Sequence, residues 1–110
     1  MPSLYVLNTP ILTEYGMYDF RKISLSEVKE MLSRGSSFAY ISAIGHEGTA
    51  ALMSQLTGIQ IPVNRVAVKM QLGDLAIVFR VLERLPEGKV LTQEELEKVP
   101  YEFGILERVL

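Results

Sequence analysis

The chain has 110 residues, of which 48% are hydrophobic, and this length and composition predict one domain spanning residues 1–110. Its 11 basic and 13 acidic side chains give a net charge of -2, which argues against binding to duplex nucleic acid or to an anionic membrane surface. A chain with no cysteine and a single histidine excludes disulfides, thiolate zinc sites and multi-histidine metal sites, so we expect no metal and no other cofactor.

The N-terminal region predicts two strands and a helix. Leu4–Leu7 is apolar at every position, which is typical of a central strand that is covered on both faces. Tyr18–Arg21 is predicted to be a short edge strand, after a loop that contains proline and glycine. Ser24 and Glu27 then form a capping box, so we expect a helix to begin after Ser24.

The middle of the chain predicts a strand, a tight turn and a second helix. Phe38–Ser42 has the composition of a buried strand, and it leads into a turn at Gly45 and His46. The helix that follows is expected to end at Gly58. Its buried face comprises Thr49, Leu52, Met53 and Leu56.

The next two segments predict an antiparallel hairpin. Arg65–Met70 alternates apolar and polar side chains, as a half-buried strand does. The turn Gln71–Asp74 then reverses the chain into Leu75–Leu82, which is almost wholly apolar. Arg80 is the exception, and a charged side chain in an apolar strand requires a counter-charge.

The C-terminal region predicts a turn at Glu83–Gly88, a short helix capped by Thr92 and Glu95, and a last strand over Tyr101–Arg108. Together the elements predict an α/β fold, a single domain with a mixed sheet of roughly five strands flanked by helices. The first apolar stretch is too short for a signal peptide and no run approaches membrane-spanning length, so we expect a cytoplasmic protein.

The only histidine lies between two glycines at the predicted strand-to-helix junction, in the sequence Ser42-Ala43-Ile44-Gly45-His46-Glu47-Gly48-Thr49. The free N–H groups and positive dipole end of a helix start can bind a phosphate beside an imidazole that moves protons near neutral pH. A histidine at this place can equally serve only as a helix cap or as a partly buried side chain. The residues alone leave both interpretations open.

A single histidine without metal or thiol can catalyse transphosphorylation of RNA, because the substrate supplies its own 2'-hydroxyl nucleophile. His46 would then protonate the departing 5'-oxygen. A helix start disfavours an imidazolium, so a carboxylate is needed nearby, and Glu87 in the turn after Leu82 is the candidate. The turn that contains Glu87 can also be an ordinary surface loop.

Five side chains are candidates for holding an anionic ligand. Arg65, Arg80 and Arg84 come from the predicted hairpin and its exit, where they can contact a phosphate or pair with carboxylates instead. Asn8 follows the first strand and can read an adenine edge or close an Asx turn. Thr49 can contact phosphate or bond within its own helix.

Four segments of the chain resemble the viral anti-CRISPR ring nuclease family, and in order they span nearly its whole length. They are Leu7-Asn8, Ser42–Glu47, Val63–Val66 and Arg84–Leu91. The most specific marks are the Ile-Gly-His sequence that ends at His46 and the Arg-Leu-x-Glu-Gly-Lys sequence that starts at Arg84.

The resemblance implies a homodimer that binds cyclic tetra-adenylate and cuts it without metal into linear di-adenylates with 2',3'-cyclic phosphate ends, suppressing type III CRISPR signalling in the host cytoplasm. It implies His46 as the general acid and Glu87 as the group that assists it. The residues that would hold the ligand are Asn8, Gly45, Thr49, Arg65, Arg80 and Arg84. A two-fold dimer would bring two copies of His46 to opposite phosphates of the ring.

Departures from the family pattern leave an alternative function open. Relatives often carry one serine shortly after the asparagine and another just after the histidine–acid pair, where this chain has Pro10, Ile11 and Gly48. Some relatives also have an amide side chain at the place of Arg80. The alternative is a non-catalytic sponge that sequesters the ring, or a regulatory dimer.

Overall fold

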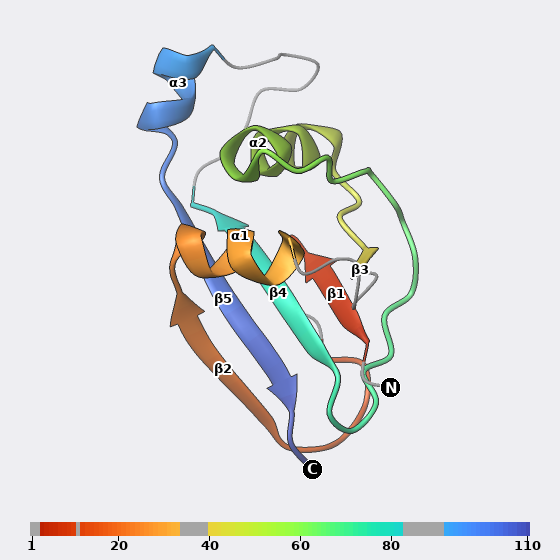
Figure 1. Cartoon of the computed structure of the whole chain (residues 1–110). Coiled ribbons are helices and arrows are strands. Elements are labelled where there is room, and N and C mark those ends of the chain that lie inside the picture. Colours follow the sequence, from red (N-terminus) through yellow and green to blue (C-terminus); the bar gives the residue numbers. More distant parts are fainter. Residues whose placement is uncertain (1–2, 11, 34–39, 83–91) are drawn as a thin grey trace.

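Strand β4 (Leu75–Val81) is the middle strand of the sheet and is paired along both edges. It runs parallel to β1 (Leu4–Leu7) and antiparallel to β5 (Tyr101–Arg108). Beyond these, β3 (Tyr40–Ser42) pairs in parallel with β1, and β2 (Tyr18–Ile23) pairs antiparallel with β5. The order β2-β5-β4-β1-β3 confirms the predicted α/β fold with a mixed five-stranded sheet (Figure 1).

The computed structural model describes residues 3–10, 12–33, 40–82 and 92–110. Three helices lie in these ranges, namely α1 (Leu25–Ser33), α2 (Glu47–Thr57) and α3 (Gln93–Lys98). Within the described part of the chain, no helix is both long and apolar enough to cross a membrane.

Two of the predicted capping boxes are present. The backbone N–H of Glu27 donates to Ser24 Oγ at 3.2 Å, and the N–H of Ser24 donates back to Glu27 Oε1 at 3.3 Å. Thr92 and Glu95 repeat this exchange at 3.2 Å in both directions. Helix α2 ends as predicted at Gly58, whose φ of 73° lies in the left-handed region that favours glycine.

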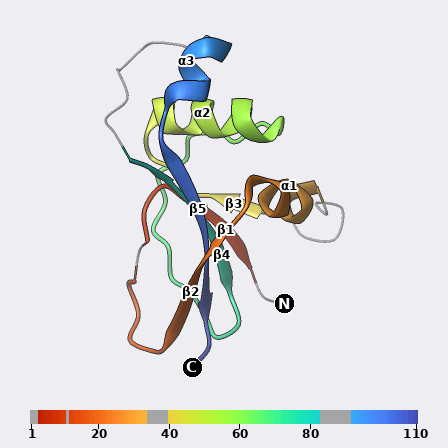
Figure 2. The same ribbon diagram turned by 90° about the vertical axis from the view of Figure 1, so that its left-hand side faces the viewer.

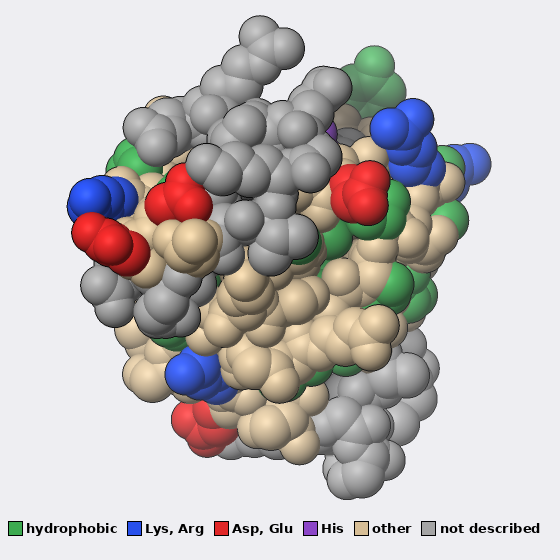
Figure 3. Space-filling view, turned by 90° about the horizontal axis from the view of Figure 1, so that it is seen from above, with side chains coloured by type: hydrophobic (Ala, Val, Ile, Leu, Met, Phe, Trp, Pro, Cys, Tyr) green, Lys and Arg blue, Asp and Glu red, His purple; other side chains and the backbone are tan. Residues whose placement is uncertain are grey.

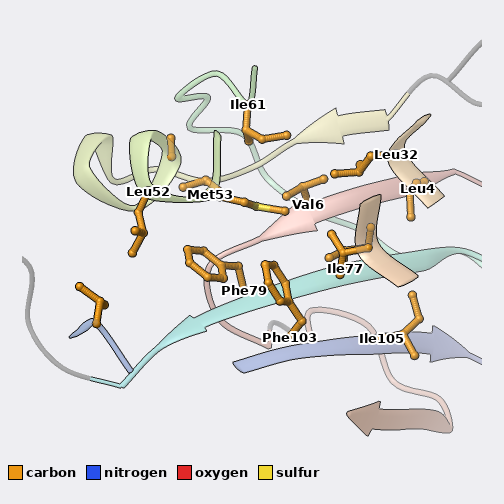
Figure 4. Close-up of a cluster of buried hydrophobic side chains, with 14 residues drawn as sticks. Leu4, Val6, Leu32, Leu52, Met53, Ile61, Ile77, Phe79, Phe103 and Ile105 are labelled. Atoms are coloured by element: carbon orange, nitrogen blue, oxygen red, sulfur yellow. The ribbon is translucent and has the colours of Figure 1, made fainter. Parts of the chain in front are cut away.

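One face of the sheet carries both longer helices (Figure 2). Leu32 from α1 and Met53 from α2 belong to the same buried cluster as side chains from β1, β4 and β5 (Figure 4). At its centre, the rings of Phe79 and Phe103 stack with their centroids 4.9 Å apart. The buried members from the strands are Leu4, Val6, Ile77, Phe79, Phe103 and Ile105.

The opposite face of the sheet is covered by the connection between α2 and β4 rather than by a helix. Val68 and Met70 of this connection are buried in a second cluster with Leu7, Ala76, Val78 and Leu106. Two side chains hold the connection in place, because Thr13 Oγ1 donates to the Val68 carbonyl at 2.5 Å and Arg108 Nη1 donates to the Met70 carbonyl at 2.8 Å. The expected flanking by helices therefore applies to one face.

The predicted hairpin between Arg65–Met70 and Leu75–Leu82 is wrong. Arg65–Met70 forms no strand, and β4 pairs instead with β1 and β5. Both edges of β4 are therefore occupied, which leaves Arg65–Met70 no strand partner there. The alternating pattern reports burial against the sheet face, where Val68 and Met70 are buried while Val66 is 45% exposed.

Among the described residues of the strand predicted over Phe38–Ser42, Tyr40–Ser42 form β3, which lies at an edge of the sheet rather than in its interior. Ile41 is consequently 38% exposed. Residues 38–39 lie outside the described residues, as does the turn predicted at Glu83–Gly88.

The three parallel strands bring their carboxyl ends to the same edge of the sheet. Val6 is in register with Ser42 on one side and with Ile77 on the other. Residues that follow β1, β3 and β4 therefore gather at this edge, the position at which open α/β sheets place binding groups.

Candidate functional site at the strand-to-helix junction

His46 is the N-cap residue of α2. Its backbone is extended, with φ -118° and ψ 121°, and its Nδ1 atom accepts a hydrogen bond from the backbone N–H of Thr49 at 3.2 Å. The carbonyl of His46 accepts from Ala50 N at 3.0 Å, which closes the first turn of the helix. The capping interpretation of the histidine is confirmed, and the side chain is at the same time partly exposed at the surface (Figure 3).

The capping contact occupies one ring nitrogen of His46, so the other is the one that could act on a ligand. A neutral imidazole that accepts at Nδ1 carries its hydrogen on Nε2. Thr49 Oγ1 also lies 3.2 Å from Nδ1, and a hydroxyl can donate to a neutral ring or accept from a protonated one. Thr49 is only 8% exposed, and the described hydrogen bonds of its hydroxyl and backbone N–H are with His46. Its predicted contact with ligand stays a prediction.

The start of α2 has backbone donors to which no described residue bonds. In the described part of the chain, the backbone N–H groups of Glu47 and Gly48 have no partner, whereas Thr49 N is taken by the imidazole. Free N–H groups at a helix N-terminus, with the positive end of the helix dipole, favour an anion. His46 and the N–H groups of Glu47 and Gly48 therefore lie together at the first turn of α2.

Arg65 lies against the same junction. Its Nε atom donates to the Gly45 carbonyl at 3.0 Å, and a Cβ atom added at Gly45 would stand 3.1 Å from Arg65 Cγ. The arginine side chain thus passes over Gly45, and a Cβ atom there would require Arg65 to shift by a few tenths of an ångström. No ion pair of Arg65 falls within the described residues, so the predicted pairing with a carboxylate is not seen there.

Sequence reasoning missed the role of the residues that hold this junction together. Asn64 donates from Nδ2 to the Ser42 carbonyl at 2.7 Å and from its backbone N–H to the Ile44 carbonyl at 2.9 Å. Ser42 Oγ in turn donates to the Pro62 carbonyl at 2.6 Å. These contacts join positions that are 20 and 22 residues apart, and no local sequence pattern marks them.

Asn8 and Arg80 lie along the same edge of the sheet. Asn8 directly follows β1, and no hydrogen bond of its side chain falls within the described residues. The predicted counter-charge of Arg80 is present, because Arg80 Nη1 lies 3.4 Å from Glu102 Oε2 across the β4–β5 pair. Both partners of this pair are partly exposed, so the arginine does not need a buried acid.

Two predicted site residues, Arg84 and Glu87, lie outside the described residues. The structure therefore brings together His46, Gly45, Thr49 and Arg65 and places Asn8 and Arg80 on neighbouring strand ends. Among the described residues, no three histidine or acidic side chains converge as a metal site would require.

The sequence matches a family model over residues 4–103, described as STIV B116-like. The uncharacterised protein YddF of Bacillus subtilis is 41% identical over 103 residues, which cover 94% of each chain. The uncharacterised protein ORF117 of Acidianus two-tailed virus is 38% identical, with coverage of 96% of this chain and 93% of the viral one. The solved structure of B116 from Sulfolobus turreted icosahedral virus superimposes with a TM-score of 0.83 at 28% identity, covering 96% of this chain and 99% of B116. The chain therefore belongs to the STIV B116-like family, which includes proteins of archaeal viruses.

Proposed function

We propose that the protein is a metal-independent ring nuclease that cleaves cyclic tetra-adenylate and thereby suppresses type III CRISPR signalling. The observation that carries this proposal is the geometry of His46. Its Nδ1 atom is tied to the first turn of α2, its Nε2 atom is left for a ligand, and Arg65 lies across the preceding glycine. The similarity to proteins of archaeal viruses supports a role in suppressing a host defence signal.

The reaction needs no group that the chain lacks. A 2'-oxygen of the ring attacks the adjacent phosphorus, and the bond from phosphorus to the 5'-oxygen breaks. His46 delivers a proton to the departing 5'-oxygen and takes one back from solvent, while the proton of the 2'-hydroxyl passes to solvent, so the protons balance and no water is consumed. Two such cleavages convert one ring into two di-adenylates, each with a 5'-hydroxyl and a 2',3'-cyclic phosphate.

The charge that develops on the phosphorane oxygens requires donors that are already in place. The N–H groups of Glu47 and Gly48 and the Arg65 guanidinium supply them next to His46. Asn8, Arg80 and Arg84 would extend the contacts to other parts of the ring, and Glu87 would assist His46. When the imidazole acts as the acid, its Nδ1 carries a hydrogen, which the nearby hydroxyl oxygen of Thr49 can accept in place of the contact with the Thr49 N–H.

A homodimer is part of the proposal because one chain carries one histidine. Cyclic tetra-adenylate has four-fold chemical symmetry, so a two-fold axis through its centre places opposite phosphates beside equivalent side chains. Each protomer would then supply half of the groups.

The test is incubation with cyclic tetra-adenylate in the presence of a chelator, followed by chromatography. We expect the ring to disappear in favour of linear di-adenylate. An intact ring with the enzyme in excess would reject catalysis, and tight binding without product would favour the non-catalytic sponge. If no cyclic oligoadenylate raises the melting temperature, a regulatory dimer without a nucleotide ligand becomes the better account.

A further inference from the structure

Asn64 bonds to both carbonyl groups that frame the turn before His46. Its side-chain Nδ2 reaches the Ser42 carbonyl at 2.7 Å, and its backbone N–H reaches the Ile44 carbonyl at 2.9 Å. The first of these carbonyls ends the edge strand β3, and the second lies two residues before the histidine. One residue thus satisfies two carbonyls that no strand partner satisfies on that side.

Arg65 continues the same pattern. Its Nε atom donates to the Gly45 carbonyl at 3.0 Å, so residues 64 and 65 together bind the carbonyls of residues 42, 44 and 45. The peptide that contains the Gly45 carbonyl is the one that begins His46. The clamp formed by Asn64 and Arg65 therefore acts directly on the backbone of the histidine.

We infer that Asn64 is a positioning residue for the reaction proposed above, on which this inference rests, and that it holds Arg65 and His46 in one frame. His46 and Arg65 are 19 positions apart in the sequence. β3 is a short edge strand, and the connection that carries Arg65 has no strand ladder of its own. Among the described contacts, the Ser42 hydroxyl also holds this connection, at the Pro62 carbonyl, but Asn64 is the residue next to Arg65 and the one that bonds the Ser42 carbonyl.

A change in the distance between the His46 imidazole and the Arg65 guanidinium should affect the cleavage rate more than ligand binding. Displacement of a catalytic group by about 1 Å can cost about a hundredfold in rate, because the near-attack geometry is lost while most contacts survive. Asn64 has no place in the proposed contacts with the ring, so its loss should act through this geometry alone.

The diagnostic variant is Asn64→Asp, which keeps the size of the side chain and its backbone N–H. It replaces the Nδ2 donor by an oxygen that faces the Ser42 carbonyl, so the contact turns from attraction to repulsion. The matched control is Ser54→Ala. Ser54 Oγ accepts from the N–H of Ile61 at 2.8 Å, so this variant loosens the same connection at its start and leaves the clamp intact.

Two readouts are measured on both variants. The first is kcat and KM for cyclic tetra-adenylate, where we expect Asn64→Asp to lower kcat about tenfold and to raise KM no more than about threefold. The second is the exchange of the Arg65 Nε–H proton with water, followed by NMR in the free protein. We expect this proton to be protected in the wild type and in Ser54→Ala and to exchange faster in Asn64→Asp.

Unchanged protection of the Arg65 proton in Asn64→Asp, with kcat within about twofold of the wild type, would overturn the inference. An equal loss of kcat in Ser54→Ala at the same melting temperature would also overturn it, since general loosening would then explain the effect. A wild type that leaves the ring intact would refute the proposed function, and the exchange rates would still decide whether Asn64 fixes Arg65. If Asn64→Asp does not fold, Asn64→Ala takes its place in both measurements.

Discussion

The Nδ1 atom of His46 and the backbone nitrogen of Thr49 lie 3.2 Å apart, so one imidazole nitrogen caps the first turn of α2, while no described residue bonds to the other. His46 therefore has a structural role as the N-cap of α2 and a proposed catalytic role as the proton donor. A substitution that keeps the cap and removes the proton donor separates the two roles.

The pair His46→Asn and His46→Ala makes this separation. Asparagine is among the best N-cap residues, so His46→Asn should keep the free energy of unfolding within about 0.5 kcal/mol of the wild type, whereas His46→Ala should lose about 1 kcal/mol. Both should slow cleavage of cyclic tetra-adenylate about a hundredfold or more, with binding largely kept. Denaturant titration and single-turnover kinetics measure the two effects. Full activity in His46→Asn would reduce the histidine to a cap.

The hydroxyl of Thr49 is expected to orient the imidazole. Thr49→Val preserves shape and removes the hydroxyl 3.2 Å from Nδ1, whereas Thr49→Ser keeps it. We expect Thr49→Val to lower the cleavage rate about tenfold with the dissociation constant of the ring within about twofold, and Thr49→Ser to stay near the wild type. Loss of binding in parallel with rate would instead make Thr49 a direct ligand contact.

Two glycine substitutions should have opposite profiles. Gly45→Ala places a Cβ atom 3.1 Å from Arg65 Cγ and should push the arginine aside, which weakens binding of the ring about tenfold or more. Gly58→Ala meets nothing within 4 Å, but its positive φ makes the substitution cost about 1 kcal/mol of stability. Calorimetric binding and thermal melts distinguish them. Equal binding by Gly45→Ala and the wild type would remove Arg65 from the proposed site.

Asp74 should be a stability residue without a role in ligand binding. It is buried, and its carboxylate accepts from the N–H groups of Ser3 and Gln71, each at 2.8 Å. Asp74→Ala leaves both donors unpaired and should lower the free energy of unfolding by about 2–4 kcal/mol. Urea titration measures this, and the affinity for the ring should not change. A loss below about 0.5 kcal/mol would show that water replaces the carboxylate.

Local rules predicted most of the secondary structure. The boxes at Ser24 and Thr92 and the stop at Gly58 depend on contacts between residues no more than four apart, so the sequence carries them directly. β5 occupies the predicted range Tyr101–Arg108 without change. The N-cap interpretation of His46 followed from its place at the predicted strand-to-helix junction, and the structure confirms it.

Long-range pairing escaped prediction for a physical reason. Alternating burial over Arg65–Met70 reflects contact with a sheet face, and that pattern is the same whether or not a strand ladder forms. In the same way, the bond from Asn64 to Ser42 joins residues 22 positions apart, and nothing local marks it. The expectation that His46 and Arg65 share a site came from the family resemblance, while the clamp that Asn64 and Arg65 form on the backbone before His46 needed coordinates.

The most direct measurement is the product profile of cyclic tetra-adenylate after incubation with excess wild-type protein in chelator, beside His46→Asn at equal concentration. We expect the wild type to yield linear di-adenylate ending in a 2',3'-cyclic phosphate, identified by mass spectrometry, and His46→Asn to bind the ring and leave it intact. An intact ring with both proteins, or the same product at the same rate from both, would contradict the role of His46 as the proton donor.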